Sequence, residues 1–138
     1  AVIDDILLVL RHPAADRGLS VRVDCAPAAT FAGDRHDLEE MIGNLLDNAV
    51  KWAATRIDIT VRASAGEVVV AIADDGPGMA DIDHARALSR GGRLDETGAA
   101  GHGLGLAIVH DLAALNGGRL RLDRAKAGGL LAELTLPG

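Results

Sequence analysis

Aromatic side chains are nearly absent from this sequence of 138 residues, which contains one Phe, one Trp and no Tyr. The core must therefore be aliphatic, and an aromatic ring such as that of Trp52 stands out wherever a binding site is considered. Cysteine is equally scarce. The single Cys25 excludes an internal disulfide and lies in no CxxC or CxxH pattern for a metal, so we interpret it as a small core residue in a reducing compartment.

An excess of positive charge is also missing. With 20 acidic and 14 basic residues the net charge is −6, which gives no general attraction to nucleic acid or to an anionic membrane. The longest apolar run is far below the roughly 20 residues of a membrane-spanning helix, and the N-terminus lacks a signal-peptide layout. We therefore expect a soluble piece with no nucleic-acid partner and no direct membrane contact, in which local groups hold any phosphate.

The length fits one domain over residues 1–138, and a hydrophobic fraction of 49% suffices for a core. Hydrophobic periodicity predicts three helices and five strands. The helices are expected within 2–18, 35–54 and 104–115, and the strands at 19–25, 56–62, 67–73, 119–123 and 130–136. Because paired strands are separated by helices, we predict an α+β two-layer sandwich, with a mixed β-sheet packed on one face by about three α-helices.

Two local signals refine this prediction. Asp34 precedes the second predicted helix as an N-cap candidate, and Asp37 stands at the third helical position in a capping-box-like arrangement. Residues 79–101 show no sustained periodicity and contain several glycines. A loop of that length inside a compact domain is usually functional or disordered.

The second predicted helix carries a polar stripe formed by Glu40, Asn44, Asp47, Asn48 and Lys51. Such a stripe is usually a solvated face. Asparagine is a poor helix former, however, and two of them four residues apart bring no obvious structural gain. An amide oxygen is a suitable neutral ligand for Mg²⁺, which shares its shell with phosphates, and the lysine one turn on could meet a phosphate.

The stretch "DDGPGM" follows the apolar run "VVVAIA". An aspartate at the end of a buried strand can accept a hydrogen bond from the 6-amino group of adenine, which guanine replaces with an acceptor. We assign this role to Asp75, with Gly76 and Gly78 leaving room for the approach and Pro77 stiffening the turn. An ordinary Asp-Gly-Pro-Gly turn is the alternative.

The glycines of "GHGLG" (Gly101, Gly103, Gly105) belong neither to a P-loop nor to a dinucleotide fingerprint, because no GxxxxGK[ST] is present and the segment follows a loop. They open the third predicted helix, where free backbone N–H groups and the helix dipole favour an anion. A flexible hinge with close helix packing is the alternative.

The order N-x-x-x-N-A-x-K, D-G-x-G-M and G-x-G-L-G-L-A resembles the N, G1 and G2 boxes of the GHKL superfamily of gyrases, heat-shock chaperones, sensor histidine kinases and MutL. The segments "NLLDNAVKW" and "GHGLGLAIV" resemble the catalytic, ATP-binding (HATPase_c) domain of a bacterial sensor histidine kinase, over nearly the whole chain. The resemblance implies a Bergerat-type ATP-binding fold. Its N box would span about 37–52, its G1 box 73–79, its ATP lid 79–103 and its G2 box 101–107, and "SRGGRLDETG" resembles the lid of PhoQ-like kinases.

By this resemblance ATP and Mg²⁺ are the cofactors, Asn48 coordinates Mg²⁺, Asn44 lines the phosphate site and Lys51 contacts phosphate. Asp75 would bind adenine N6. The remaining implied nucleotide-binding residues are Trp52, Gly76, Gly78, Met79, Arg93, Gly101, His102, Gly103, Leu104 and Gly105. Arg90 or Arg93 would reach the phosphates or a partner domain.

Three features depart from the family pattern. Trp52 stands where Tyr is usual, the lid has no Phe, and no segment resembles a phosphoacceptor helix. None of the five histidines is nominated as phosphoacceptor: His12, His36, His84, His102 and His110. The acceptor histidine would then belong to a separate dimerisation domain.

The resemblance thus implies transfer of the ATP γ-phosphate to that histidine in a two-component system, with a response regulator acting on the parent protein. Because the chain begins within a predicted helix, we expect a monomeric piece of a larger homodimeric sensor, cytoplasmic itself and joined to an inner-membrane parent. Two alternatives remain. A GHKL-type ATPase switch would need a carboxylate where Asn44 stands, and a degenerate kinase would bind nucleotide for regulation only.

Overall fold

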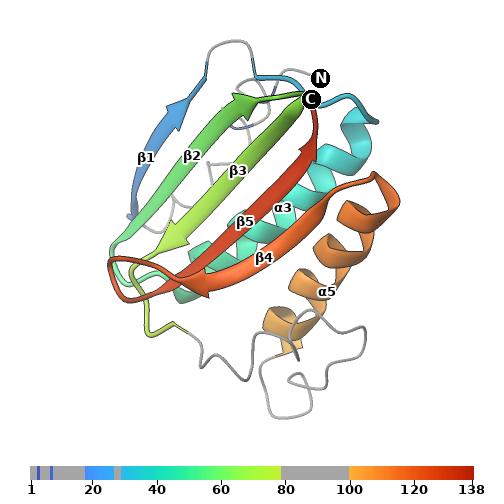
Figure 1. The fold of residues 1–138 in the computed structure, drawn as a ribbon. Coiled ribbons are helices and arrows are strands. Elements are labelled where there is room, and N and C mark those ends of the chain that lie inside the picture. Colours follow the sequence, from blue (N-terminus) through green and yellow to red (C-terminus); the bar gives the residue numbers. More distant parts are fainter. Residues whose placement is uncertain (1–2, 4–6, 8–17, 27–28, 79–99) are drawn as a thin grey trace.

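The computed structural model describes residues 3, 7, 18–26, 29–78 and 100–138, with side chains in the last range from residue 105 onward. Figure 1 shows that the labelled helices lie behind a twisted sheet. In chain order the elements are β1 (Ser20–Cys25), α3 (Arg35–Trp52), β2 (Arg56–Ser64), β3 (Glu67–Asp74), α5 (Ala100–Leu115), β4 (Arg119–Arg124) and β5 (Leu130–Pro137).

The five strands form one sheet in the order β1-β2-β3-β5-β4. β1 runs parallel to β2, and the other three pairs are antiparallel, so the sheet is mixed. Both α3 and α5 cover the same face (Figure 1). The predicted α+β two-layer sandwich is therefore confirmed. The first predicted helix lies outside the described residues except for Ile3 and Leu7, which are helical and buried.

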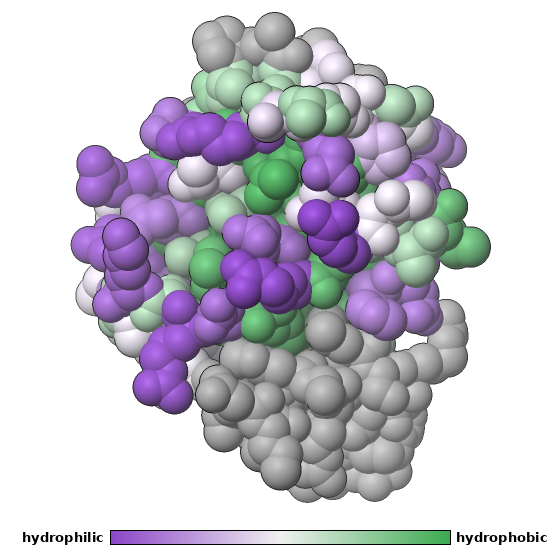
Figure 2. Space-filling view, in the orientation of Figure 1, coloured by the Kyte–Doolittle hydropathy of each residue, from purple (hydrophilic) through white to green (hydrophobic). Residues whose placement is uncertain are grey.

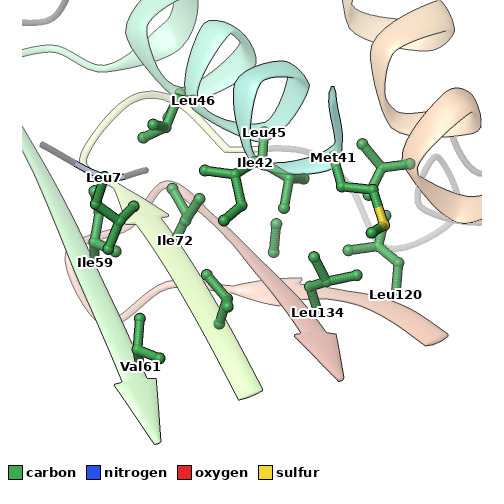
Figure 3. Packing of buried hydrophobic residues seen from close by; sticks show 14 of the residues in the cluster. Leu7, Met41, Ile42, Leu45, Leu46, Ile59, Val61, Ile72, Leu120 and Leu134 are labelled. Atoms are coloured by element: carbon green, nitrogen blue, oxygen red, sulfur yellow. The ribbon is translucent and has the colours of Figure 1, made fainter. Parts of the chain in front are cut away.

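The core fills the space between α3 and the sheet with aliphatic side chains (Figure 3). From α3, Met41, Ile42 and Leu45 are at most 2% exposed, as the apolar stripe of the sequence predicts. Strand β3 alternates, with every second residue buried against the helices and the others partly exposed. Each fully buried side chain of this size contributes about 1.5–3 kcal/mol. This packing fixes which face of α3 turns away from the sheet.

The N-terminus of α3 is capped by Asp34, whose Oδ1 accepts a hydrogen bond from the amide of His36 at 2.9 Å. Asp37 does not complete the expected capping box. Its Oδ2 instead accepts from Nδ2 of Asn116 at 3.1 Å, and this joins the start of α3 to the end of α5. A side chain that sequence spacing assigns to a local motif is thus used for a tertiary contact.

The boundaries of α5 differ from the prediction. The helix begins at Ala100 and not at Leu104, so Gly101, Gly103 and Gly105 lie within its first turns and do not precede it. Its end agrees with the predicted end at Leu115, where the sequence "NGG" (residues 116–118) is a stop signal. Gly117 has a φ of +78°, and the amide of Gly118 donates to the carbonyl of Ala113 at 2.8 Å.

The outer face of the sheet carries ion pairs, and Figure 2 shows hydrophilic side chains interspersed with hydrophobic ones on it. Arg62 lies 2.9 Å from Asp24, and Arg121 lies 3.3 Å from Glu133. Exposed pairs of this kind contribute little to stability, with a median of about 0–1 kcal/mol. No helix among the described residues has the length and apolar character to cross a membrane.

Candidate nucleotide-binding site

Helix α3 presents Asn44, Asn48, Lys51 and Trp52 along one side, because these positions are four, seven and eight residues apart. Asn48 is 7% exposed, and its Oδ1 has no hydrogen-bond partner among the described residues. Leaving a buried amide oxygen unsatisfied costs about 1–3 kcal/mol. A ligand that donates a hydrogen bond to this oxygen, or a cation that the oxygen coordinates, would remove the cost of leaving it unsatisfied.

Asn44 lies where α3 meets α5. Its Nδ2 donates to the carbonyl of Glu40 at 2.8 Å, one turn back on the same helix. A Cβ placed on Gly105 would lie 3.6 Å from Oδ1 of Asn44. The structure thus brings Asn44 of α3 beside Gly105, in the first turns of α5.

The last turn of α3 ends with a lysine over an aromatic ring. The Nζ of Lys51 lies 5.6 Å from the centroid of the Trp52 ring, within the range of a cation–π contact. Lys51 is exposed and its charge also complements the C-terminal end of the helix dipole. The position leaves the ammonium group accessible to an anion.

Asp74, the last residue of β3, is 3% exposed on the face of the strand that carries Val70 and Ile72. Its Oδ1 accepts from the amides of Gly76 at 2.9 Å and Leu130 at 3.3 Å. Burial raises the pKa of this carboxyl above its usual value. The two amide bonds oppose that shift, and the neighbouring charge of Asp75 adds to it.

Asp75 points to a different part of the fold. Its carboxylate accepts from the amides of Ala54, Thr55 and Arg56 at 2.9, 2.9 and 3.0 Å, and from the hydroxyl of Thr55. The hydrogen bond from the Thr55 side chain, followed by those from the backbone, holds the pKa of Asp75 well below its usual range. The predicted adenine-binding role of Asp75 therefore conflicts with its position, since this carboxylate fastens the α3–β2 connection.

A small cavity opens beside Asp74 and is lined by Trp52, Asp74, Gly78 and Leu130. Its volume of about 10 Å³ holds roughly one water molecule, so a purine ring requires these walls to move apart. At the rim of this cavity, the backbone at Gly76 lies close to the backbone at the end of α3. A Cβ on Gly76 would lie 2.0 Å from the carbonyl oxygen of Trp52, which explains the need for glycine there.

The structure brings together Asn44 and Gly105 at one point, and Trp52 and Gly78 at the cavity with Gly76 at its rim. Two predicted site residues, Met79 and Arg93, lie outside the described residues. Four others fall in the first turns of α5, in a part whose side chains the structure does not describe: Gly101, His102, Gly103 and Leu104.

Sequence reasoning missed two of the groups at the cavity, Asp74 and Leu130. The first was detectable, because strict alternation from Val70 and Ile72 places Asp74 on the helix-facing side of β3. The second comes from β5 and depends on the pairing of β3 with β5, for which no local signal exists.

Replacing Asp75 with Asn is expected to lower stability at neutral pH and to change its pH dependence. The unfolded chain has an aspartate pKa of about 3.9, and the folded value is lower, so the folded state binds fewer protons and acid favours unfolding. The stability that Asp75 contributes is therefore present in full above the unfolded pKa of about 3.9, and it is lost progressively as the pH falls below that pKa toward the folded pKa. Urea unfolding of both proteins from pH 7 to pH 3 measures this.

The gap between wild type and variant should shrink as the pH falls, and a gap that stays constant would contradict the assigned contact. Asp58→Asn, at an exposed pair with Arg56, is the matched control and should differ little from the wild type in stability at any pH.

The carboxyl of Asp74 has the opposite effect on the pH dependence of stability. Its raised pKa means that the folded state holds the proton more readily, so this carboxyl costs stability as the pH rises through its pKa.

Comparison with known proteins identifies the family of this chain. The family profile described as histidine kinase-, DNA gyrase B-, and HSP90-like ATPase matches residues 33–138. The sensor protein kinase CarS of Pseudomonas aeruginosa is 45% identical over 119 residues, covering 86% of this chain and 26% of CarS. The virulence sensor histidine kinase PhoQ of Salmonella typhimurium is 28% identical over 133 residues, covering 96% of this chain and 27% of PhoQ.

Among solved structures, the ATP-binding domain of PrrB from Mycobacterium tuberculosis superposes with a TM-score of 0.81 at 30% identity, covering 100% of this chain and 95% of that one. The family profile and this superposition thus define an ATP-binding domain, and the chain belongs to the family of histidine kinase-, DNA gyrase B- and HSP90-like ATPases. Within that family it is a catalytic domain of the sensor histidine kinase type. The chain spans about a quarter of the length of the curated relatives it matches.

Proposed function

We propose that this domain binds ATP and presents its γ-phosphate to a histidine on a separate dimerisation domain of the same parent protein. The observation that carries the proposal is a buried carboxylate, Asp74, at the edge of a cavity beside the only tryptophan of the chain. The partly buried ring of Trp52 offers a flat surface against which a purine can stack.

In this proposal Asp74 takes over the role that sequence spacing assigned to Asp75. Both hydrogen bonds that Asp74 accepts within the described residues go to Oδ1. Oδ2 is then available to the 6-amino group of adenine, which donates, whereas guanine and hypoxanthine present an acceptor at that position. The site would therefore select adenine, and Gly76 and Gly78 hold the turn that positions the carboxylate.

The residues on α3 fit Mg²⁺. Asn48 supplies a buried amide oxygen with no partner among the described residues, and hard oxygen ligands are what this ion prefers. Bound there with the phosphates of ATP, the ion would neutralise charge on the leaving diphosphate. Asn44, one turn earlier, would line the phosphate site, and Lys51 would meet a phosphate oxygen as a point charge.

Phosphoryl transfer in such a site depends on positioning and charge neutralisation. A neutral imidazole is already nucleophilic, so this chain needs to supply no general base. Asn44 cannot take a proton from water, which argues against a dedicated ATPase. Met79, Arg93 and the first turn of α5, with Gly101, His102, Gly103 and Leu104, complete the proposed nucleotide-binding set.

The partners follow from the same proposal. The acceptor histidine belongs to the dimerisation domain of a homodimeric parent, and a response regulator receives the phosphoryl group from it. We propose that this domain is cytoplasmic and monomeric when isolated, and that the parent is a sensor of the inner membrane. The likeness to CarS and PhoQ, both named as sensor proteins, supports this placement.

Phosphotransfer to the parent's dimerisation domain is the test. Mixing the two domains with radiolabelled ATP and Mg²⁺ should label the dimerisation domain with an acid-labile, base-stable phosphate. Replacing the acceptor histidine with Gln is the control and should abolish the label. If the domain binds ATP but no label transfers, the domain is a regulatory nucleotide-binding module, and free phosphate release without transfer would identify an ATPase.

A further inference from the structure

The turn between β4 and β5 lies directly against the end of β3. A Cβ placed on Gly129 would lie 2.1 Å from Oδ1 and 2.2 Å from the carbonyl oxygen of Asp74, closer than real side chains approach. The next amide, that of Leu130, donates to the same Oδ1 at 3.3 Å. The turn itself is closed by a bond from the amide of Ala125 to the carbonyl of Gly129 at 2.8 Å.

Gly128 and Gly129 both lie in this turn, but a different structural constraint favours glycine at each position. Gly128 has a φ of +101°, a conformation that other residues rarely adopt, but a Cβ there would meet nothing within 4 Å. Gly129 is not among the described residues with positive φ, so its backbone conformation would accept alanine. Only the contact with Asp74 excludes a side chain at this position.

We propose that Gly129 and the amide of Leu130 are positioning groups for adenine recognition. Together with the amide of Gly76, the Leu130 amide holds Oδ1 of Asp74, which fixes the rotation of the carboxylate and directs Oδ2 to the 6-amino group. Gly129 lets β5 come close enough for that bond. This inference rests on the proposed function, and it assigns part of the base specificity to a turn about 50 residues beyond the G1 box in the chain.

The test compares ATP with inosine triphosphate, which has an oxygen in place of the amino group. Both are titrated with Mg²⁺ into the wild type, Gly129→Ala and Gly128→Ala, and Trp52 fluorescence is followed. The wild type should prefer ATP by roughly tenfold or more, as a hydrogen bond to a charged group allows. Gly129→Ala should reduce that ratio to within about threefold, because a displaced carboxylate no longer reads the amino group.

Gly128→Ala is the matched control, since its strained φ lowers the melting temperature while the carboxylate of Asp74 keeps its place and the ratio stays at the wild-type value. A Gly129→Ala protein that keeps the wild-type ratio overturns the inference. A wild type that binds ATP and inosine triphosphate equally overturns the proposed function instead.

If Gly129→Ala does not fold, the wild type alone gives the answer. By NMR, the amide resonance of Leu130 should shift with pH in step with the carboxyl carbon of Asp74, as should that of Gly76. If the amide resonance of Leu130 does not shift as Asp74 titrates, the inference is overturned.

Discussion

Asp74→Asn is expected to weaken ATP binding by roughly 10- to 100-fold, the loss associated with one hydrogen bond to a charged group. The asparagine oxygen can keep the two amide donors of Gly76 and Leu130, because both now bond to the same oxygen of Asp74. Its NH₂ group then occupies the position of Oδ2 and opposes the amino group of adenine. Calorimetric titration with ATP and with inosine triphosphate measures the loss, which should be much smaller for the second nucleotide.

Asp75→Asn is the neighbouring control. Its carboxylate bonds to residues 54–56 and not to the cavity, so the variant should lose stability while its ratio of ATP to inosine triphosphate affinity changes by less than about threefold. The reverse pattern, with base selectivity lost in Asp75→Asn and kept in Asp74→Asn, would refute the assignment and restore the role that sequence spacing gave to Asp75.

Asn48→Leu is expected to raise the free energy of unfolding by about 1 kcal/mol and to remove the effect of Mg²⁺ on nucleotide binding. The buried Oδ1 of Asn48 has no partner among the described residues, and removing an unsatisfied buried polar atom relieves a cost of about 1–3 kcal/mol. Leucine has a similar size and a better helix propensity. Urea unfolding without ligand, and ATP titration with and without Mg²⁺, test the two parts.

Asp47→Leu, at the exposed neighbouring position of α3, controls for helix propensity and should leave the Mg²⁺ effect unchanged. If Asn48→Leu is destabilised by more than about 1 kcal/mol, its amide is satisfied in solution and the site is not poised for an ion. If the variant still binds ATP more tightly with Mg²⁺, the ion is held elsewhere. A gain in stability together with a loss of Mg²⁺ dependence is the pattern of a functional residue held at a cost to the fold.

The fold was predictable because each element has a strong local signal. The apolar stripe of α3 and the strands expected at 56–62 and 67–73 agree with the structure, and the "NGG" stop ends α5 as expected. The start of α5 was placed four residues late, since glycines oppose helix formation locally and only tertiary contacts, such as Gly105 beside Asn44, compensate.

The sequence indicated which segments contribute to the site, but not how their side chains are oriented. Motif order identified both asparagines and the G1 turn, but it did not decide which of two adjacent aspartates faces the helices. Strand alternation decides it, because Asp74 continues the buried side of β3 and Asp75 cannot. The contribution of Leu130 depends on a contact between segments 56 residues apart in sequence, which local patterns do not encode.

Titration of the isolated domain with ATP·Mg²⁺, followed by the fluorescence of Trp52, tests the central claim most directly. Trp52 is the only tryptophan and lines the cavity with Asp74, so its emission reports occupancy without a label. A saturable change at lower concentrations of ATP than of inosine triphosphate is the predicted result. A folded protein whose emission changes for neither nucleotide, or equally for both, would contradict an adenine site at this cavity.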